Sequence, residues 1–196
     1  MCWNQSVSLN TFLFGLFAVS LGVYNKVITP LAGLGGISLI SMQLIEFFAW
    51  RNLGNKDTMA LLSKVGLGII LVQPLLAQLE ILTTYLVPLA YIGFVVLYLG
   101  LSLSTTEFSM VKAPNGHLRW NWLSQSPLFL SIWLAFLTLP FLYTKNYVIF
   151  FSLLISALIS LYTYYKDNTW GSMWCWICNV YSVYLLAMVF GKDICR

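Results

Sequence analysis

Charged residues are scarce in this chain of 196 residues. Asp, Glu, Lys and Arg make up 8% of it and the mean hydropathy is +0.83, whereas soluble domains carry roughly a quarter charged residues. The ten Lys and Arg stand singly between apolar runs, so no basic patch could follow the phosphates of a nucleic acid. This composition excludes an ordinary soluble domain and a nucleic-acid partner, and it predicts a protein embedded in a lipid bilayer.

The chain also lacks the residue patterns of several membrane enzymes and channels. It has one histidine, too few for the zinc site of hydrolases related to alkaline ceramidases. A retinal protein needs a lysine in the middle of its last helix, and the last apolar run has none before Lys192. Sequences of the types Gly-x-Ser-x-Gly, His-Glu-x-x-His, phosphate-binding Gly-Lys-Ser/Thr and potassium filter do not occur either. No catalytic residue is therefore predicted, and any metal or cofactor stays undetermined.

Apolar runs, in contrast, fill most of the chain. Crossing a hydrocarbon core of about 30 Å takes about 20 helical residues. Runs of roughly that length lie at 8–25, 30–50, 59–80, 84–103, 126–143, 147–165 and 170–190, and polar breaks separate them. We therefore predict an all-α integral membrane protein in which residues 1–196 form a single domain, a bundle of seven transmembrane helices.

Seven spans would place the two ends of the chain on opposite sides of the membrane. We call the side of Met1 the near face and the opposite side the far face. Seven of the eight tryptophans fall at or just inside the near face, which is typical of anchoring at lipid headgroups. By the positive-inside rule the near face and the amino terminus should be cytoplasmic, because six of the ten Lys and Arg lie in near-face segments: Arg51, Lys56, Lys64, Lys112, Arg119 and Lys166.

A carboxylate inside the second apolar run is the main candidate for a function. Gln43, Glu46 and Trp50 lie three or four residues apart, so one face of a helix would carry all three. Glu46 would lie roughly 7 to 8 Å below the near-face boundary, where an ionised carboxylate is costly unless it faces a polar cavity or a cation. We predict a polar pocket that opens to the near face. The alternative is a neutral Glu46 that hydrogen-bonds neighbouring helices or reaches toward Arg51.

The last apolar run supplies a second polar stripe. Cys175, Cys178 and Asn179 share one face at helical spacing and begin at about the depth of Glu46. The Cys-x-x-Cys spacing occurs in metal and redox sites, but a solitary pair equally fits two small residues that ease helix packing. The stripe is therefore a candidate wall of the same pocket.

Polar residues of the third run should have several roles. Pro74 removes one backbone hydrogen bond and should kink the helix, and we expect Gln73 to satisfy the freed carbonyl or to line the cavity. Gln78 and Glu80 would lie near the far face, where solvation explains them. In the sixth run, a stripe of small residues predicts close helix packing: Ser152, Ser156 and Ser160.

Four short segments resemble a family of small uncharacterised microbial membrane proteins. They are MCWN at 1–4, MQLIEFFAW at 42–50, GHL at 116–118 and SMWCW at 172–176. Members of that family read Met-Cys-Phe-Ser, Gln-Gln-x-x-Glu-Gly-x-x-Trp, Gly-His-Ile and Trp-Cys-Phe in the same order. This chain departs from the family by Trp3-Asn4 for Phe-Ser, by Met42 for the first glutamine and by Phe47 for the glycine.

The resemblance implies which residues belong to one site, but it implies no activity. It implies that six residues belong together, and the assignment of segments to faces places them all at the near face: Cys2, Gln43, Glu46, Trp50, His117 and Cys175.

Three functions remain open. In the first, a one-sided polar pocket binds, senses or conducts a small ligand, an ion or a proton. Glu46 would titrate, Gln43 and Asn179 would form hydrogen-bonding walls, and His117 would lie in a covering loop. In the second, the protein is a membrane scaffold, for example a homo-oligomer, held by its polar stripes. In the third, Cys2, Cys175 and His117 form a thiol- or metal-dependent enzyme site.

The expected partners are the lipid bilayer and a small molecule or ion. The candidate pocket residues are Cys2, Gln43, Glu46, Trp50, Gln73, His117, Cys175, Cys178 and Asn179.

Overall fold

The computed structural model describes residues 4–81, 84–102, 107–124 and 127–194. In these residues, eight α-helices account for most of the chain: α1 (Gln5–Tyr24), α2 (Pro30–Arg51), α3 (Lys56–Ile81), α4 (Leu86–Ser102), α5 (Pro127–Tyr143), α6 (Tyr147–Tyr164), α7 (Trp170–Ile177) and α8 (Val180–Ile194). Between α4 and α5 lie the strands β1 (Met110–Lys112) and β2 (Leu118–Trp120) and the short 3-10 helix η1 (Asn121–Ser124). The prediction of an all-α protein is confirmed.

Helices form where the apolar runs predicted them, because polar residues and proline mark where they begin. Asn4 precedes α1, and its side-chain oxygen accepts a hydrogen bond from the Val7 amide at 2.9 Å. Thr29 caps α2 in the same way, and Pro30 occupies the first turn, where its missing N–H costs nothing.

Five helical segments of the described chain are long and apolar enough to cross a membrane. They are α1, α2, α3, α6 and the segment Trp170–Gly191, which contains α7 and most of α8. α4 and α5 are apolar but shorter, with 17 residues each. The finding agrees with the expectation of a membrane protein, and it makes the helices the elements that position any site.

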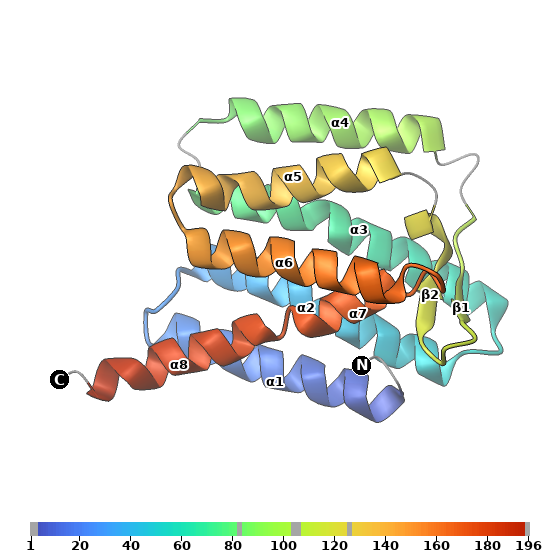
Figure 1. The fold of residues 1–196 in the computed structure, drawn as a ribbon, viewed down its shortest axis with the longest axis horizontal. Coiled ribbons are helices and arrows are strands. Elements are labelled where there is room, and N and C mark those ends of the chain that lie inside the picture. The colour runs from blue at the N-terminus through green and yellow to red at the C-terminus, as the bar shows by residue number, and fades with distance from the viewer. Residues whose placement is uncertain (1–3, 82–83, 103–106, 125–126, 195–196) are drawn as a thin grey trace.

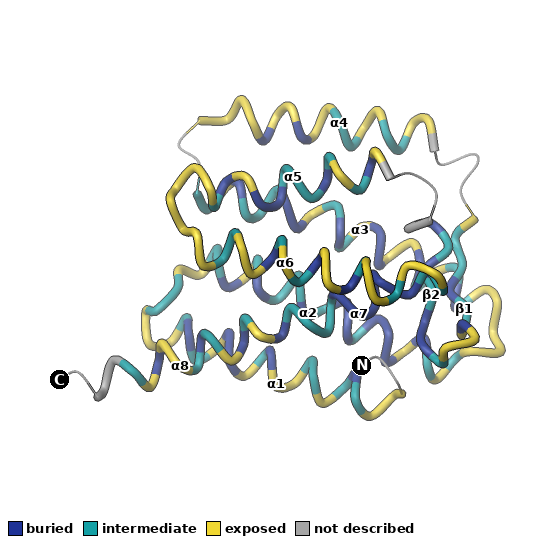
Figure 2. Tube along the Cα trace, viewed as in Figure 1, coloured by how far each residue is buried: buried dark blue, intermediate teal, exposed yellow. Residues whose placement is uncertain are grey.

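The helices run roughly parallel or antiparallel to one another (Figure 1). Contacts link α1 to α2, α2 to α3, α3 to α5, α5 to α6, α6 to α7, and α8 back to α1, so these elements form a closed ring. α4 lies outside the ring and presents mostly exposed residues (Figure 2). It is held by aromatic stacking on α5, where the rings of Phe94 and Phe129 lie 5.6 Å apart.

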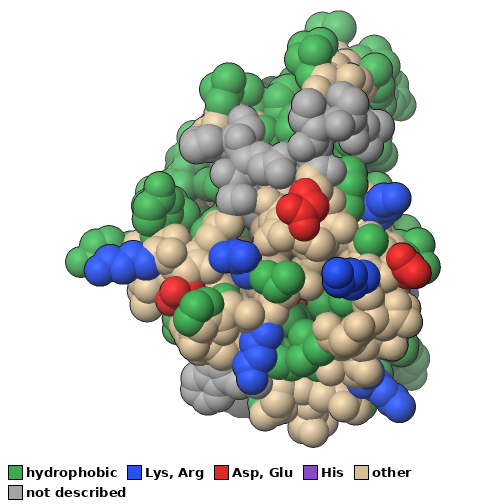
Figure 3. Space-filling model, turned by 90° about the vertical axis from the view of Figure 1, so that its right-hand side faces the viewer, with side chains coloured by type: hydrophobic (Ala, Val, Ile, Leu, Met, Phe, Trp, Pro, Cys, Tyr) green, Lys and Arg blue, Asp and Glu red, His purple; other side chains and the backbone are tan. Residues whose placement is uncertain are grey.

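A β-hairpin covers the near-face end of this ring. Its strands are antiparallel, with Met110 opposite Trp120, and the turn between them contains Gly116 at a φ of 85°. Although its segment is a connection between helices, the hairpin is buried on one side: Leu118 and Trp120 are at most 1% exposed, and Trp122 in the following η1 is 1% exposed. Charged side chains are scattered over the outer surface of that end (Figure 3). The sequence pattern predicted only a covering loop here.

The predicted last span 170–190 is interrupted in the structure. α7 ends at Ile177 and α8 begins at Val180, so Cys178 and Asn179 form a break between two helices. The Asn179 side chain explains the break, because its amide nitrogen donates to the carbonyls of Cys175 (3.4 Å) and Trp176 (3.3 Å). Asparagine often competes with the helical hydrogen-bond pattern in this way.

Pro74 lies inside α3, and the partner of the carbonyl that it frees differs from our expectation. The Ile70 carbonyl, four residues earlier, accepts a hydrogen bond from the indole nitrogen of Trp133 on α5 at 2.8 Å. Gln73 instead donates to the Ser38 carbonyl on α2 at 3.2 Å. A freed carbonyl in an apolar bundle needs a donor, and a neighbouring helix supplies it.

Two further expectations from the sequence are wrong. Gln78 is not solvated: it is 0% exposed, and its amide donates to the Phe136 carbonyl of α5 at 3.2 Å. Headgroup anchoring does not explain several near-face tryptophans either, because they are buried in the protein: Trp120, Trp122, Trp170 and Trp174.

Candidate functional site

A buried polar cluster lies beneath the hairpin. Gln43 and Glu46 on α2 are both 0% exposed. The indole nitrogen of Trp120 on β2 donates to Ser172 Oγ on α7 at 3.0 Å and approaches Glu46 Oε1 at 3.4 Å. The Ser172 hydroxyl in turn donates to the Leu118 carbonyl at 2.9 Å. The cluster therefore joins α2, β2 and α7, and Glu46 faces the bundle rather than lipid.

The other near-face candidates lie around this cluster. The Cys175 thiol is close enough to Glu46 for an electrostatic interaction between them. Trp50 is half-buried, and the ammonium of Lys112 on β1 lies 5.8 Å from the centre of its ring. Cys2 lies outside the described residues.

His117 lies at the end of the hairpin turn and contacts α6. Its ring meets that of Tyr164 edge to face, with 5.6 Å between the ring centres. The Asn115 amide of the same turn donates to Thr169 Oγ1 at 2.8 Å. These contacts tie the hairpin to the connection between α6 and α7.

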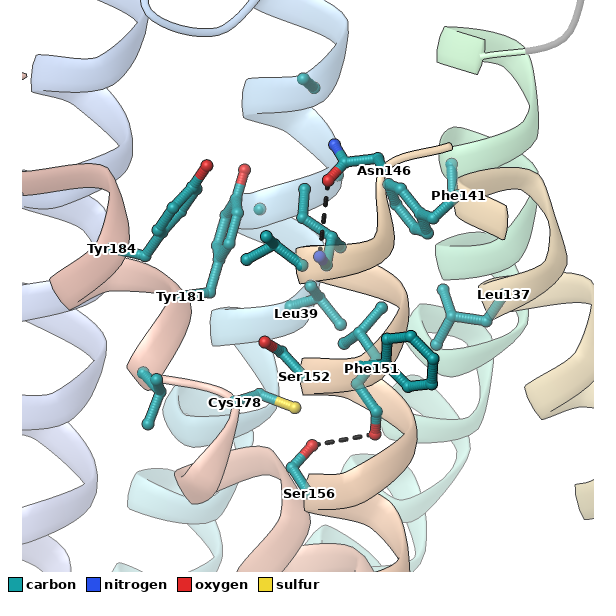
Figure 4. A pocket seen from close by; sticks show the side chains of 18 of the residues that line it. Leu39, Leu137, Phe141, Asn146, Phe151, Ser152, Ser156, Cys178, Tyr181 and Tyr184 are labelled. Carbon is teal, nitrogen blue, oxygen red and sulfur yellow. Dashed lines mark hydrogen bonds between the residues drawn. The ribbon is translucent and has the colours of Figure 1, made fainter. Parts of the chain in front are cut away.

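A large cavity lies elsewhere, in the far-face half of the ring. Its volume is about 910 Å³, and α2, α3, α5, α6, α8 and the break between α7 and α8 form its walls (Figure 4). Its polar wall residues are Thr29, Gln73, Glu80, Thr144, Asn146, Tyr147, Ser152, Ser156, Cys178, Tyr181 and Tyr184, and aliphatic or aromatic residues and glycines form the rest.

Small residues on facing helices create this volume. Ala32, Gly35 and Gly36 line it from α2, and Ala77 lines it from α3. On α6, Ser152 projects toward Cys178 across the space (Figure 4). The predicted small-residue stripe of α6 therefore has two roles, since Ser160 farther along it donates to the Trp170 carbonyl at 2.6 Å and fastens α6 to α7.

The cavity is open along the gap between α6 and α8. Several of its wall residues are half or more exposed, namely Phe151 (50%) and Ile155 (51%) on α6 and Val180 (63%) on α8. α6 packs closely on α7, whereas α8 turns away to pack on α1 (Figure 1). The break at Cys178 and Asn179 thus separates the two helices that border the opening.

The structure divides the predicted pocket residues between two places. Gln73 and Cys178 line the cavity, whereas the other described candidates do not: Gln43, Glu46, Trp50, His117, Cys175 and Asn179. Where the sequence predicted a pocket around Glu46, the buried indole of Trp120 approaches its carboxylate. The sequence analysis did not predict that Glu80, Tyr181 and Tyr184 line a cavity. The signal for Glu80 was its position as a carboxylate at the end of an apolar run.

The thiols and the single histidine do not assemble into a metal centre in the described ranges. Cys175 and Cys178 are both free thiols, and no group of three or more His, Cys, Asp or Glu side chains among the described residues could hold a metal ion.

Comparisons with protein-family models, with curated proteins and with solved structures found no match for this chain. The resemblance to a microbial membrane family therefore stays a prediction, and any function has to be argued from the site itself.

Proposed function

We propose that this is a multi-pass membrane protein that binds an amphipathic, lipid-like molecule in the cavity between α6 and α8. The observation that carries the proposal is the cavity itself. Its volume of about 910 Å³ is near the upper end of the range for small-molecule sites, roughly 300–1,000 Å³. Its mainly apolar wall suits a hydrocarbon chain, and its polar residues near one end suit a head group.

The proposed topology explains how such a ligand would reach the cavity. We propose that α4 and α5 cross the membrane together with the five longer segments, which gives seven spans. Their 17 residues each correspond to about 25 Å of helix, near the lower limit for a span. The gap between α6 and α8 would then face the hydrocarbon region, so a lipid-like molecule could enter sideways from the bilayer.

The far-face position of the head group follows from the wall residues. Glu80 is the second-last residue of α3, and Asn146 immediately precedes α6, so both would lie near the membrane boundary. On α6 the wall extends from Tyr147 to Ile159, a rise of about 18 Å. The chain of the ligand would occupy that depth and end near Gln73 and Cys178.

We assign the Glu46 cluster to closing the near-face end of the bundle. The support for this assignment is that the hydrogen bonds of Trp120 connect the hairpin to α2 and α7. Proton or ion binding at Glu46 is the second candidate function, and its support is the complete burial of this carboxylate.

A photoactivatable alkyl glucoside tests the main proposal. The protein would be inserted in nanodiscs of uncharged galactolipid, labelled by light with this probe and analysed by peptide mass spectrometry. We expect labelling on the cavity walls of α6 and α8. Ser152→Trp should fill the cavity and abolish that labelling, and Ala77→Phe should do the same from α3.

Leu158→Trp is the matched control, because Leu158 lies on the same helix as Ser152, is 55% exposed and does not line the cavity. It should leave the labelling of the cavity walls unchanged. The proposal is wrong if the probe labels the outer surfaces of α4 and α6 as strongly as the cavity walls, or if correctly folded Ser152→Trp and Ala77→Phe are labelled like the unmodified protein.

A further inference from the structure

The charge of the cavity wall comes from one residue. Of the described residues that line the cavity, Glu80 alone is charged, and none is Lys, Arg or His. Glu80 is half-buried, and within the described part of the chain it takes part in no salt bridge. Lys26 and Lys145 are next in the chain to wall residues, but neither forms a salt bridge with Glu80. A carboxylate at the edge of an apolar cavity that is not in a salt bridge attracts cations and repels anions.

Two tyrosines of α8 line the same cavity as this carboxylate. Figure 4 shows the rings of Tyr181 and Tyr184, from α8, side by side, with both hydroxyls toward the same end of the cavity as Asn146. The Tyr181 hydroxyl is close enough to Glu80 and to Tyr184 for electrostatic interactions with both. Aromatic faces next to a carboxylate are the combination that proteins use to hold ammonium groups, including quaternary ones.

Neutral hydrogen-bonding groups complete the same end of the cavity. Thr29 precedes α2, Thr144 follows α5 and Asn146 precedes α6, and all three line the cavity. The side-chain oxygen of Asn146 faces the Ile149 amide at 3.5 Å. These groups can accept hydrogen bonds from an amine or from hydroxyls, and they add no positive charge that would favour a phosphate or a carboxylate.

We propose that the ligand of this cavity is a cationic amphiphile, with an amine or quaternary ammonium head group held by Glu80, Tyr181 and Tyr184 at the far face. The inference rests on the proposed function and names the chemical class of its ligand. An anionic amphiphile with the same chain would meet the Glu80 carboxylate and bind more weakly. A neutral amphiphile binds through its chain alone, so its affinity lies between those of the cationic and the anionic amphiphile.

Three probes with the same photoactivatable alkyl chain test the inference. Their head groups are trimethylammonium, glucoside and sulfonate, and each is offered to the protein in nanodiscs of uncharged galactolipid. Labelling of the α6 and α8 walls is normalised to labelling of the exposed face of α4, which corrects for unequal partition into the bilayer. We expect the trimethylammonium probe to label the cavity about tenfold more than the sulfonate probe, since cation–π contacts and the carboxylate act together.

Glu80→Gln separates charge from shape, because it keeps the size and removes the negative charge. It should reduce the trimethylammonium-to-sulfonate ratio to about one and leave glucoside labelling unchanged. Glu107→Gln is the matched control, since Glu107 is an exposed carboxylate between α4 and β1. It should preserve the full ratio.

The outcomes distinguish the two proposals. If the glucoside probe fails to label the cavity, the proposed function is wrong. If the glucoside probe labels the cavity and all three head groups label it equally, or if Glu80→Gln keeps the full preference for trimethylammonium, the proposed function stands and the cationic class is wrong.

Discussion

The indole ring of Trp120 lies directly against the backbone of Gly66. A Cβ atom placed on Gly66 would be 2.3 Å from Cζ3 and 2.6 Å from Cη2 of this ring, and non-bonded Cβ contacts this short essentially never occur. Trp120 is 1% exposed, and its indole nitrogen reaches Ser172 and Glu46. The absence of a side chain at one position of α3 therefore allows the hairpin to insert a tryptophan into the near-face end of the ring.

The first prediction concerns this contact. Gly66→Ala should lower the free energy of unfolding by about 1–3 kcal/mol, because the added methyl group overpacks a buried site. Gly68→Ala, two residues along the same helix, should be neutral or stabilising by up to about 1 kcal/mol, since nothing lies within 4 Å of its Cβ position. Denaturant titration in mixed micelles measures both, and equal effects of the two substitutions would contradict the packing of Trp120 on α3.

The second prediction concerns the hydrogen bonds that hold the hairpin. Ser172→Ala removes the closer acceptor of the Trp120 indole and the donor to the Leu118 carbonyl, so it should cost about 1–3 kcal/mol of unfolding free energy. Ser41→Ala is the control, because the Ser41 hydroxyl donates to the Ile37 carbonyl of its own helix at 2.7 Å. Its cost should stay below about 1 kcal/mol. If Ser172→Ala leaves both the free energy of unfolding and the tryptophan fluorescence unchanged, these hydrogen bonds do not hold the hairpin to α7.

The third prediction uses the proline of α3. Trp133→Phe leaves the Ile70 carbonyl without its indole donor and should cost about 1–3 kcal/mol. In a Pro74→Ala background, the backbone amide of residue 74 can donate a hydrogen bond to the Ile70 carbonyl. Trp133→Phe should therefore lower the free energy of unfolding by at least about 1 kcal/mol less than it does in the unmodified protein. A double-mutant cycle by denaturant titration measures the difference. Strict additivity of the two substitutions would contradict the assignment of Trp133 to the carbonyl that Pro74 frees.

The fourth prediction tests the number of spans. With the four native cysteines replaced by alanine, one new cysteine is introduced as Gly54→Cys or as Tyr24→Cys. Gly54 lies between α2 and α3 and is exposed, and Tyr24 ends α1 and is 83% exposed. A membrane-impermeant maleimide should label the two from opposite sides of the bilayer, with Gly54→Cys on the cytoplasmic side by the positive-inside rule.

The matched second pair covers the shorter helices. Glu107→Cys follows α4, and Tyr143→Cys ends α5; the native side chains at both positions are exposed. Seven spans require Glu107→Cys to be labelled from the side of Gly54→Cys and Tyr143→Cys from the side of Tyr24→Cys. Labelling of Glu107→Cys from the side of Tyr24→Cys would mean that α3 or α4 does not cross, and labelling of Glu107→Cys and Tyr143→Cys from one side would mean that α5 does not cross.

Some details of the site were open to prediction from the sequence and others were not. The stripe of Gln43 and Glu46 was correctly placed toward the bundle, because helical periodicity alone decides which side chains share a face. The partner of Glu46 was not predictable, since Trp120 lies 74 residues away in the chain and its position depends on how the hairpin folds over the ring. The same long-range packing hides Gln78 from solvent.

The composition and the apolar runs by themselves determined that this is an all-α protein, where its helices lie and that several of them are apolar enough to cross a membrane, because hydrophobicity and helical periodicity are local properties of a segment. Only the tertiary structure decided where its empty space lies. That space depends on the facing residues of five different elements and on the break at Asn179, and no segment alone contains this information. The cavity therefore appeared around Glu80, Tyr181 and Tyr184, whereas the buried indole of Trp120 approaches the more conspicuous Glu46.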